Sequence, residues 1–429
     1  MDAPAPAVAG LTPSAKALFV AAAAHAQPAG VVLYVVPGDG DLEEACGDVA
    51  FFLAALEGLA PAVVGRAVLP FPSHEVDPYR GLEPHIGVTS VRARALYSIA
   101  SGTARVVIAS AAAVLPRVTT PEGLLAASLS LKPGQDISPV DLAERLVDAG
   151  FSREDPADEP GEFAIRGGIA DVFPAGHTLP VRLEFIGDTI ETMRTYDPST
   201  QRSIAPIDQM SIVPLRDILH DNRGSTIFDY LTRAAARLVV SERDEVDANI
   251  TKLYTQIQQS YENIQGNLAA GDGHRSVPSP ADLFADGDAV ASRFAHATLL
   301  SILGVDQGSR EIRCQPAVEL KGRVADWVAD IRRLRDDGET VLFVAATPGR
   351  AERTIELLKE YEVFAVPVER ADDARYASVL VATGALSQGF RLPAAGPSST
   401  PRPTSSRRSA GRRSAGGRRP RRFSRICAT

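Results

Sequence analysis

The chain has 429 residues, 45% of them apolar and 23% charged, which is the composition of a soluble globular protein of roughly two to four domains. Three widely separated cysteines exclude a disulfide framework, and the lack of a long apolar run or signal pattern predicts a cytoplasmic protein with no membrane partner. The net charge of −8 combines a stretch over 394–429 with ten arginines and no acid, and a body with 35 basic and 53 acidic residues. A body this acidic is poorly suited to binding DNA alone.

Strands and helices alternate in the first part of the chain. Three apolar runs have the length of buried parallel strands: 31–36, 63–69 and 106–109. Three other segments have helical spacing: 14–24, 42–59 and 91–99. This alternation predicts an α/β domain built on a parallel sheet.

The pattern changes in the middle of the chain. Asp141–Ala149 is an amphipathic helix, and strand signals then dominate Gly161–Arg202. Two strands, Val181–Ile186 and Thr189–Tyr196, flank Gly187-Asp188, which suits a tight hairpin turn. We expect a small β-rich domain inserted into the α/β chain.

Helical spacing returns in the last part. Apolar residues at three- and four-residue steps from Val246 to Ile264 predict one long helix packed on the core, after a helix over 226–235 and a strand over 237–241. The Gly/Pro-rich segment 270–280 is expected to be a loop. A final α/β unit is predicted from five segments: 324–334, 340–345, 350–360, 364–368 and 379–381.

Residues 10–17 approach the phosphate-binding loop pattern of Gly, four residues and Gly-Lys-Ser/Thr. Gly10 and Lys16 are in place, but Ala15 replaces the second glycine and Ala17 the hydroxyl residue that would ligate magnesium. A working loop also needs a preceding strand, for which nine residues leave little room. We therefore expect a degenerate loop that binds no ATP.

Other combinations of reactive residues are weaker. His74, Glu75 and His85 match no metal-ligand spacing, and Glu162 and Asp171 are close only in sequence. No nucleophile and base stand in a recognisable pattern. The sequence predicts no catalytic residue, metal or cofactor.

Two longer motifs are specific. The first is LPFPSHEVDPY over 69–79, followed by Pro84, His85 and Arg92. The second is GEFAIRGGIADVFP over 161–174, continuing to Ser203. Together they resemble the N-terminal part of the bacterial transcription-repair coupling factors (Mfd), which is itself similar to the excision-repair protein UvrB. The resemblance runs from about Gly10 to Pro393.

The resemblance implies a domain plan. A UvrB-like α/β module would span 1–130 and 213–315, with a UvrA-binding β-rich domain inserted over 131–212 and a small α/β domain over 316–393. Full-length relatives add an RNA-polymerase-binding domain, an ATP-dependent DNA translocase and an autoinhibitory domain. Their partners therefore include RNA polymerase and DNA. This chain would end before these domains and would retain only the domain that binds UvrA.

The Arg-rich stretch 394–429 follows the last segment that resembles the family. Its Ser, Arg, Gly and Pro content cannot bury a core, so we expect it to be disordered. Two origins stay open. It could be a basic nucleic-acid-binding tail, or the product of a reading-frame shift in a GC-rich gene, which we favour and which would make the chain a truncated product.

The resemblance also implies docking residues. The two arginines with which the family contacts UvrA fall on Arg166 and Arg182, and its aromatic contact falls on Ile186, which keeps the apolar contact but lacks a ring. Strand alternation supports this, since Arg182 and Ile186 share one face. The opposite face is apolar and consists of Val181, Leu183 and Phe185. The alternative is that both arginines pair with local acids such as Glu162 or Glu184.

Three functions follow from these observations. We favour a truncated coupling factor that docks UvrA and is not an enzyme. The first alternative is a UvrB-like ATP-dependent DNA helicase, which would need a complete phosphate loop and an Asp-Glu motor motif. The second is a non-functional gene fragment.

Overall fold

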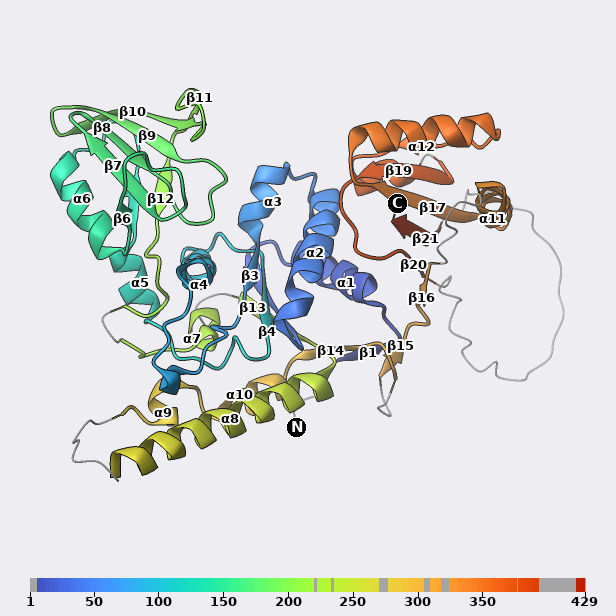
Figure 1. The fold of residues 1–429 in the computed structure, drawn as a ribbon. Coiled ribbons are helices and arrows are strands. Elements are labelled where there is room, and N and C mark those ends of the chain that lie inside the picture. Colours follow the sequence, from blue (N-terminus) through green and yellow to red (C-terminus); the bar gives the residue numbers. More distant parts are fainter. Residues whose placement is uncertain are drawn as a thin grey trace, which may run out of the picture. The chain divides into compact units, whose positions relative to one another are not determined.

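A computed structural model describes residues 6–219, 222–232, 235–269, 277–304, 309–317, 324–375, 377–392 and 422–428 (Figure 1). The chain divides into two compact units. The first comprises 1–6, 26–46 and 62–300, and the second comprises 7–25, 47–61 and 301–429. None of the described helices is long and apolar enough to cross a membrane.

The first unit contains a parallel sheet in the strand order β14–β13–β2–β4–β3. In chain order these strands are β2 (Gly30–Val36), β3 (Val68–Phe71), β4 (Val106–Ser110), β13 (Ala235–Ser241) and β14 (Thr298–Ser301). Strands β2 and β4 are buried along their whole length, which explains their continuous apolar sequence. The strands predicted over 31–36 and 106–109 are confirmed.

The predicted strand over 63–69 is wrong in its first part. Helix α3 occupies Pro61–Ala67, and β3 begins only at Val68. Pro61 suits the first position of a helix. Val63 is exposed and Val64 is buried. A helix on the protein surface gives this pattern, whereas a strand buried on both faces would bury both residues.

Helices surround this sheet and share its core. They include α4 (Ile86–Ala100), α5 (Pro121–Ala127), α7 (Ile227–Leu231), α8 (Arg243–Ala269), α9 (Pro280–Leu283) and α10 (Gly287–Ala295), with the short 3-10 turns η1 (Asp39–Asp41) and η2 (Pro78–Arg80). The long helix predicted from Val246 to Ile264 is confirmed as α8, and its apolar stripe packs on the core. The helix predicted over 226–235 is shorter, because it ends at Leu231 and Ala235 already belongs to β13.

A β-rich module is inserted between β4 and β13. Its elements are β5 (Leu129–Leu131), α6 (Pro139–Asp148), β6 (Ser152–Arg153), β7 (Glu162–Arg166), β8 (Ile169–Val172), β9 (Val181–Ile186), β10 (Thr189–Tyr196), β11 (Ser203–Pro206) and β12 (Met210–Ile212). Six strands form one sheet in the order β11–β10–β9–β8–β7–β6, antiparallel except for the parallel pair β6–β7. Strands β5 and β12 pair separately. The predicted hairpin is confirmed, with Gly187 at a φ of 64° in its turn.

The second unit contains α1 (Pro13–His25) and most of α2 (Leu42–Glu57). Strand β1 (Ala7–Ala9) pairs with β15 (Arg310–Glu311). A small α/β fold follows, made of β16 (Gln315–Pro316), α11 (Val324–Asp336), β17 (Glu339–Ala345), α12 (Pro348–Glu360), β18 (Val366–Pro367), η3 (Ala371–Arg375), β19 (Val379–Thr383) and β20 (Phe390–Arg391). The predicted final α/β unit is therefore confirmed, although the strand expected over 364–368 shortens to two residues.

The last described strand changes one expectation about the Arg-rich stretch. Residues 393–421 and 429 lie outside the described part of the chain, but β21 (Arg422–Ala428) pairs in parallel with β17 and antiparallel with β20. Disorder over the whole of 394–429 is therefore wrong for these seven residues. Backbone hydrogen bonds to an available strand edge order the segment, and amino-acid composition does not predict such pairing.

Candidate protein interface

One face of the six-stranded sheet in the inserted module lies opposite the module's core and carries exposed side chains at one end. The other face packs on α6 and holds the module's core, which includes Val181, Leu183 and Phe185. We call the first face the outer face. Strand register places the following residues on it, among others: Arg166, Ile169, Asp171, Arg182, Glu184, Ile186, Thr192 and Arg194, and alternation along β10 adds Tyr196. The three predicted docking residues, Arg166, Arg182 and Ile186, thus share one surface.

Arg182 is held firmly in this surface. Its Nε and Nη2 donate to the two carboxylate oxygens of Asp171 at 2.7 and 2.8 Å, and Asp171 is buried. The guanidinium also lies 4.7 Å from the centre of the Tyr196 ring and contacts Gln201. The hydrogen bonds to Asp171 raise the pKa of Arg182. Only 18% of the Arg182 side chain is exposed, so it shapes the surface more than it projects from it.

Arg166 is held differently. It is the last residue of β7, and 47% of its side chain is exposed. Its Nε donates to Asp155 Oδ2 at 3.0 Å, and its Nη2 contacts the other oxygen of the same carboxylate. Because both partners face solvent, this ion pair contributes less than a buried pair would, and a partner can exchange it for another.

Two exposed isoleucines complete the outer face. Ile186 is 65% exposed and Ile169 is 39% exposed. Ile169 pairs in register with Glu184, so Ile186 is its diagonal neighbour on the adjacent strand. The sequence prediction missed Ile169, although its position two residues before Asp171 places it on the same face. The pair forms a small apolar patch beside Arg166.

The alternative interpretation was that both arginines pair with local acids such as Glu162 or Glu184, and it is right about the pairing but not about the acids. Both pair with local acids, and these are Asp155 and Asp171 instead of Glu162 and Glu184. Glu162 accepts the backbone N–H groups of residues 158 and 159, and Glu184 accepts the Thr192 hydroxyl. The register of β8 and β9 places Asp171 opposite Arg182, whereas Asp155 comes from the segment that connects β6 to β7.

Two regions of the chain match known domain families. Residues 129–217 match the UvrB interaction domain, and residues 334–396 match the D3 domain of MFD. The first match contains the complete outer face. These matches make the chain similar to an N-terminal part of the transcription-repair-coupling factors.

Curated transcription-repair-coupling factors match over much of this chain. The one from Myxococcus xanthus is 30% identical over 225 residues, or 52% of this chain and 18% of its own length. Those from Haemophilus influenzae and Mycobacterium bovis are 22% and 29% identical over 75% and 69% of this chain. The chain spans 18% to 32% of the length of these three relatives.

The residues predicted to form a degenerate phosphate loop lie between β1 and α1 in the second unit. A strand does precede Gly10, contrary to expectation, since β1 ends at Ala9. Gly10 has a φ of 78°, and a Cβ there would lie 2.2 Å from the Ile312 carbonyl oxygen, so the backbone itself requires glycine. Helix α1 already starts at Pro13, which places Ala15, Lys16 and Ala17 in buried helical positions. The lysine is thus not at the surface where a phosphate would bind.

A carboxylate of the chain lies at the same helix start. Ser14 Oγ donates to Asp48 Oδ2 at 2.6 Å, and the Ser387 hydroxyl and backbone N–H donate to Asp48 at 2.7 Å each. Asp48 is buried, so these bonds compensate its desolvation. A negative charge at a helix N-terminus is favourable, and Asp48 supplies it from within the second unit.

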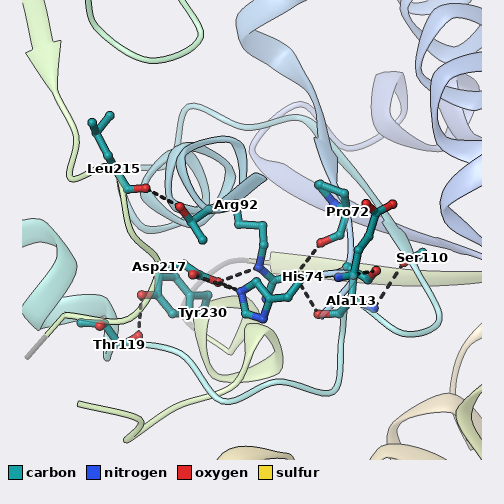
Figure 2. A network of polar contacts seen from close by, with 12 residues as sticks. Pro72, His74, Arg92, Ser110, Ala113, Thr119, Leu215, Asp217 and Tyr230 are labelled. Atoms are coloured by element: carbon teal, nitrogen blue, oxygen red, sulfur yellow. Dashed lines mark hydrogen bonds and ion pairs between the residues drawn. The ribbon is translucent and has the colours of Figure 1, made fainter. Parts of the chain in front are cut away.

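Polar residues also tie the inserted module to the body of the first unit (Figure 2). Arg92 on α4 is fully buried and its Nε donates to Asp217 Oδ2 at 2.6 Å. Its Nη1 donates to the carbonyl oxygens of Pro72 and Ala113, and its guanidinium lies 4.0 Å from the Phe71 ring centre. Asp217 follows directly after the module, so this ion pair fixes the point where the chain re-enters the body.

His74 completes this network at 3.0 Å from Asp217 Oδ2. Burial opposes the charge on Asp217, but Arg92 and His74 outweigh it and hold the pKa of Asp217 well below its usual range. Burial and the neighbouring Arg92 lower the pKa of His74, despite its bond to Asp217. His74 is therefore a structural partner, and His85 caps α4 by accepting the Gly87 N–H at 3.1 Å. Within the described residues, no group of three His, Cys, Asp or Glu side chains could hold a metal ion.

Acid should destabilise the first unit through two partly buried histidines, His74 and His177. Burial, Arg94 and Arg66 lower the pKa of His177 to about 4, and burial lowers that of His74. The unfolded chain takes up these protons below about pH 6.5, so stability falls as the pH drops from there toward about 4. His177→Gln should flatten the fall in Tm measured by circular dichroism, whereas the exposed His25→Gln should not. An unchanged slope in His177→Gln would contradict the assignment.

Proposed function

We propose that this chain docks UvrA through the outer face of its inserted module, as the UvrA-binding part of a coupling factor in transcription-coupled nucleotide excision repair. The observation that carries the proposal is the pair of exposed isoleucines, Ile169 and Ile186, on the same sheet face as the exposed Arg166, within the region that matches the UvrB interaction domain. The translocase and RNA-polymerase functions of full-length relatives are not assigned to this chain.

The three docking residues would contribute differently. Ile186, with Ile169, offers the apolar contact that a partner can desolvate, and such central contacts give most of the energy of an interface. Arg166 can exchange its solvent-exposed partner for a carboxylate or carbonyl group of UvrA. Arg182 is largely buried against Asp171 and Tyr196, so its main role would be to position β9 and to present one edge of its guanidinium.

Substitution of the apolar contact tests the proposal. Ile186→Asp should weaken binding of purified UvrA by roughly 10- to 100-fold, because a charge would be buried against an apolar surface. Val147→Asp is the matched control, since Val147 is also exposed but belongs to α6. The measurement is a titration of both variants and the parent by biolayer interferometry. Equal binding of Ile186→Asp and the parent would contradict the proposal.

The enzyme alternative has one observation in its favour, namely that β1 leads through Gly10 into α1 as a phosphate loop would. Against it, Lys16 is buried and Ala17 offers no oxygen to a metal. Assaying the same preparation for DNA-stimulated ATP hydrolysis separates the two functions, because only a helicase would hydrolyse ATP.

A further inference from the structure

An acidic segment borders the outer face of the inserted module. It spans Glu154–Glu159, connects β6 to β7 and contains four acids: Glu154, Asp155, Asp158 and Glu159. Its position is fixed at both ends. The Glu154 N–H donates to the Phe163 carbonyl at 3.0 Å, and the Asp158 and Glu159 N–H groups donate to the Glu162 carboxylate at 3.1 and 2.9 Å.

The middle of the acidic segment is attached to the outer face itself. The hydroxyl of Tyr196 donates to the Ala157 carbonyl at 2.7 Å, and both residues are fully buried. The same Tyr196 ring carries the guanidinium of Arg182. A carboxylate two residues before Ala157 is thereby held within reach of Arg166, and Asp155 forms the ion pair described above.

The two arginines of the outer face are therefore neutralised in different ways. The Arg182–Asp171 pair is largely inaccessible, with side-chain exposures of 18% and 3%, and breaking it would leave a buried charge. The Arg166–Asp155 pair has exposures of 47% and 62%, so water can solvate both groups once they separate. Of these two pairs, only the second can be opened at low cost by a partner.

We propose that Asp155 competes with a carboxylate of UvrA for Arg166, so that the acidic segment lowers and tunes the affinity of docking. This inference rests on the proposed function. A bound partner must replace the Asp155 contact with an equivalent one, which favours a surface that presents a carboxylate beside an apolar patch. When a partner surface lacks this carboxylate, Arg166 stays paired with Asp155 and adds little to the binding affinity of that partner.

Binding of purified UvrA to four variants of the full chain tests the competition. Asp155→Ala should bind about two- to five-fold more tightly than the parent, which is the range of an exposed ion pair. Arg166→Ala should bind roughly ten-fold more weakly or worse. In the double variant the Asp155 effect should disappear, because it acts through Arg166. Glu159→Gln is the matched control for removing a charge from the same segment, and it should leave the affinity near that of the parent.

A second readout does not need UvrA. Phenylglyoxal should modify Arg166 faster in Asp155→Ala than in the parent, as followed by peptide mass spectrometry, while the rate at Arg182 stays constant. This measurement also shows that the variant is folded, because unfolding would expose Arg182.

The outcomes separate the inference from the function on which it rests. If Arg166→Ala weakens binding but Asp155→Ala equals the parent, the competition is wrong and the docking proposal stands. If Asp155→Ala strengthens binding equally with and without Arg166, general charge repulsion is responsible and the competition is again wrong. If neither the parent nor Asp155→Ala binds UvrA, the docking proposal itself fails, and unchanged phenylglyoxal reactivity would overturn the competition independently.

Discussion

Arg92→Met should lower the free energy of unfolding of the first unit by about 3–5 kcal/mol, because it breaks a buried ion pair and leaves one charge behind. Methionine keeps most of the volume but removes the cation beside a fully buried carboxylate. Asp217 would keep its hydrogen bond to His74 but lose its buried cationic partner. The carbonyl groups of Pro72 and Ala113 would lose a donor as well.

Urea denaturation followed by circular dichroism would measure this loss. Arg94→Met is the control, because Arg94 lies two residues further along α4 and its guanidinium donates to the carbonyls of Gly176 and Gly65 instead of a carboxylate. It should cost about 1 kcal/mol. The double variant Arg92→Met/Asp217→Leu should recover part of the stability by removing the unpaired charge. A loss below about 1 kcal/mol in Arg92→Met would show that the pair contributes little.

Asp171→Ala should destabilise the inserted module by about 3 kcal/mol, because Arg182 would keep its charge in a mostly buried position without a carboxylate. The Tyr196 ring cannot substitute, since a cation–π contact contributes less than a bidentate ion pair. Loss of this pair should also loosen β9 and weaken the proposed docking of UvrA through Ile186.

Thermal unfolding of Asp171→Ala and of Glu191→Ala gives the comparison. Glu191 is an exposed acid on the neighbouring strand β10, and its loss should change the free energy of unfolding by no more than about 0.5 kcal/mol. Asp171→Ala/Arg182→Met should regain stability relative to Asp171→Ala alone. If both single variants unfold at the parent's temperature, the buried pair is not a stabilising element.

Much of the fold follows from periodicity. The continuous apolar run of β2, the three- and four-residue spacing of α8 and the alternation of β9 each correspond to one burial pattern. The prediction of a strand over 63–69 was wrong in its first part because a short apolar run suits a buried strand and a buried helix equally well. The strand β1 was not predicted for another reason: it has only three residues, and its pairing partner β15 lies about 300 residues away in sequence.

The candidate interface was predictable to the level of single strands. Alternation places Arg182 and Ile186 on one face, and the family resemblance adds Arg166. The ion-pair partners were not predictable, because Asp171 faces Arg182 only through the register of β8 and β9, and Asp155 reaches Arg166 only through a loop attached to Tyr196. Ile169 needed the same register information.

The antiparallel pairing of β5 with β12 has a mechanical consequence. These strands form the outgoing and returning connections of the inserted module, with Leu131 opposite Met210 and Leu129 opposite Ile212. A force that pulls the module away from the body of the unit would act on β5 and β12 in the same direction. It would therefore stretch the chain at the ends of the two strands more than it would shear the hydrogen bonds between them. Force on β12 passes along the chain to Asp217, whose buried ion pair with Arg92 attaches this end of the module to the body of the first unit.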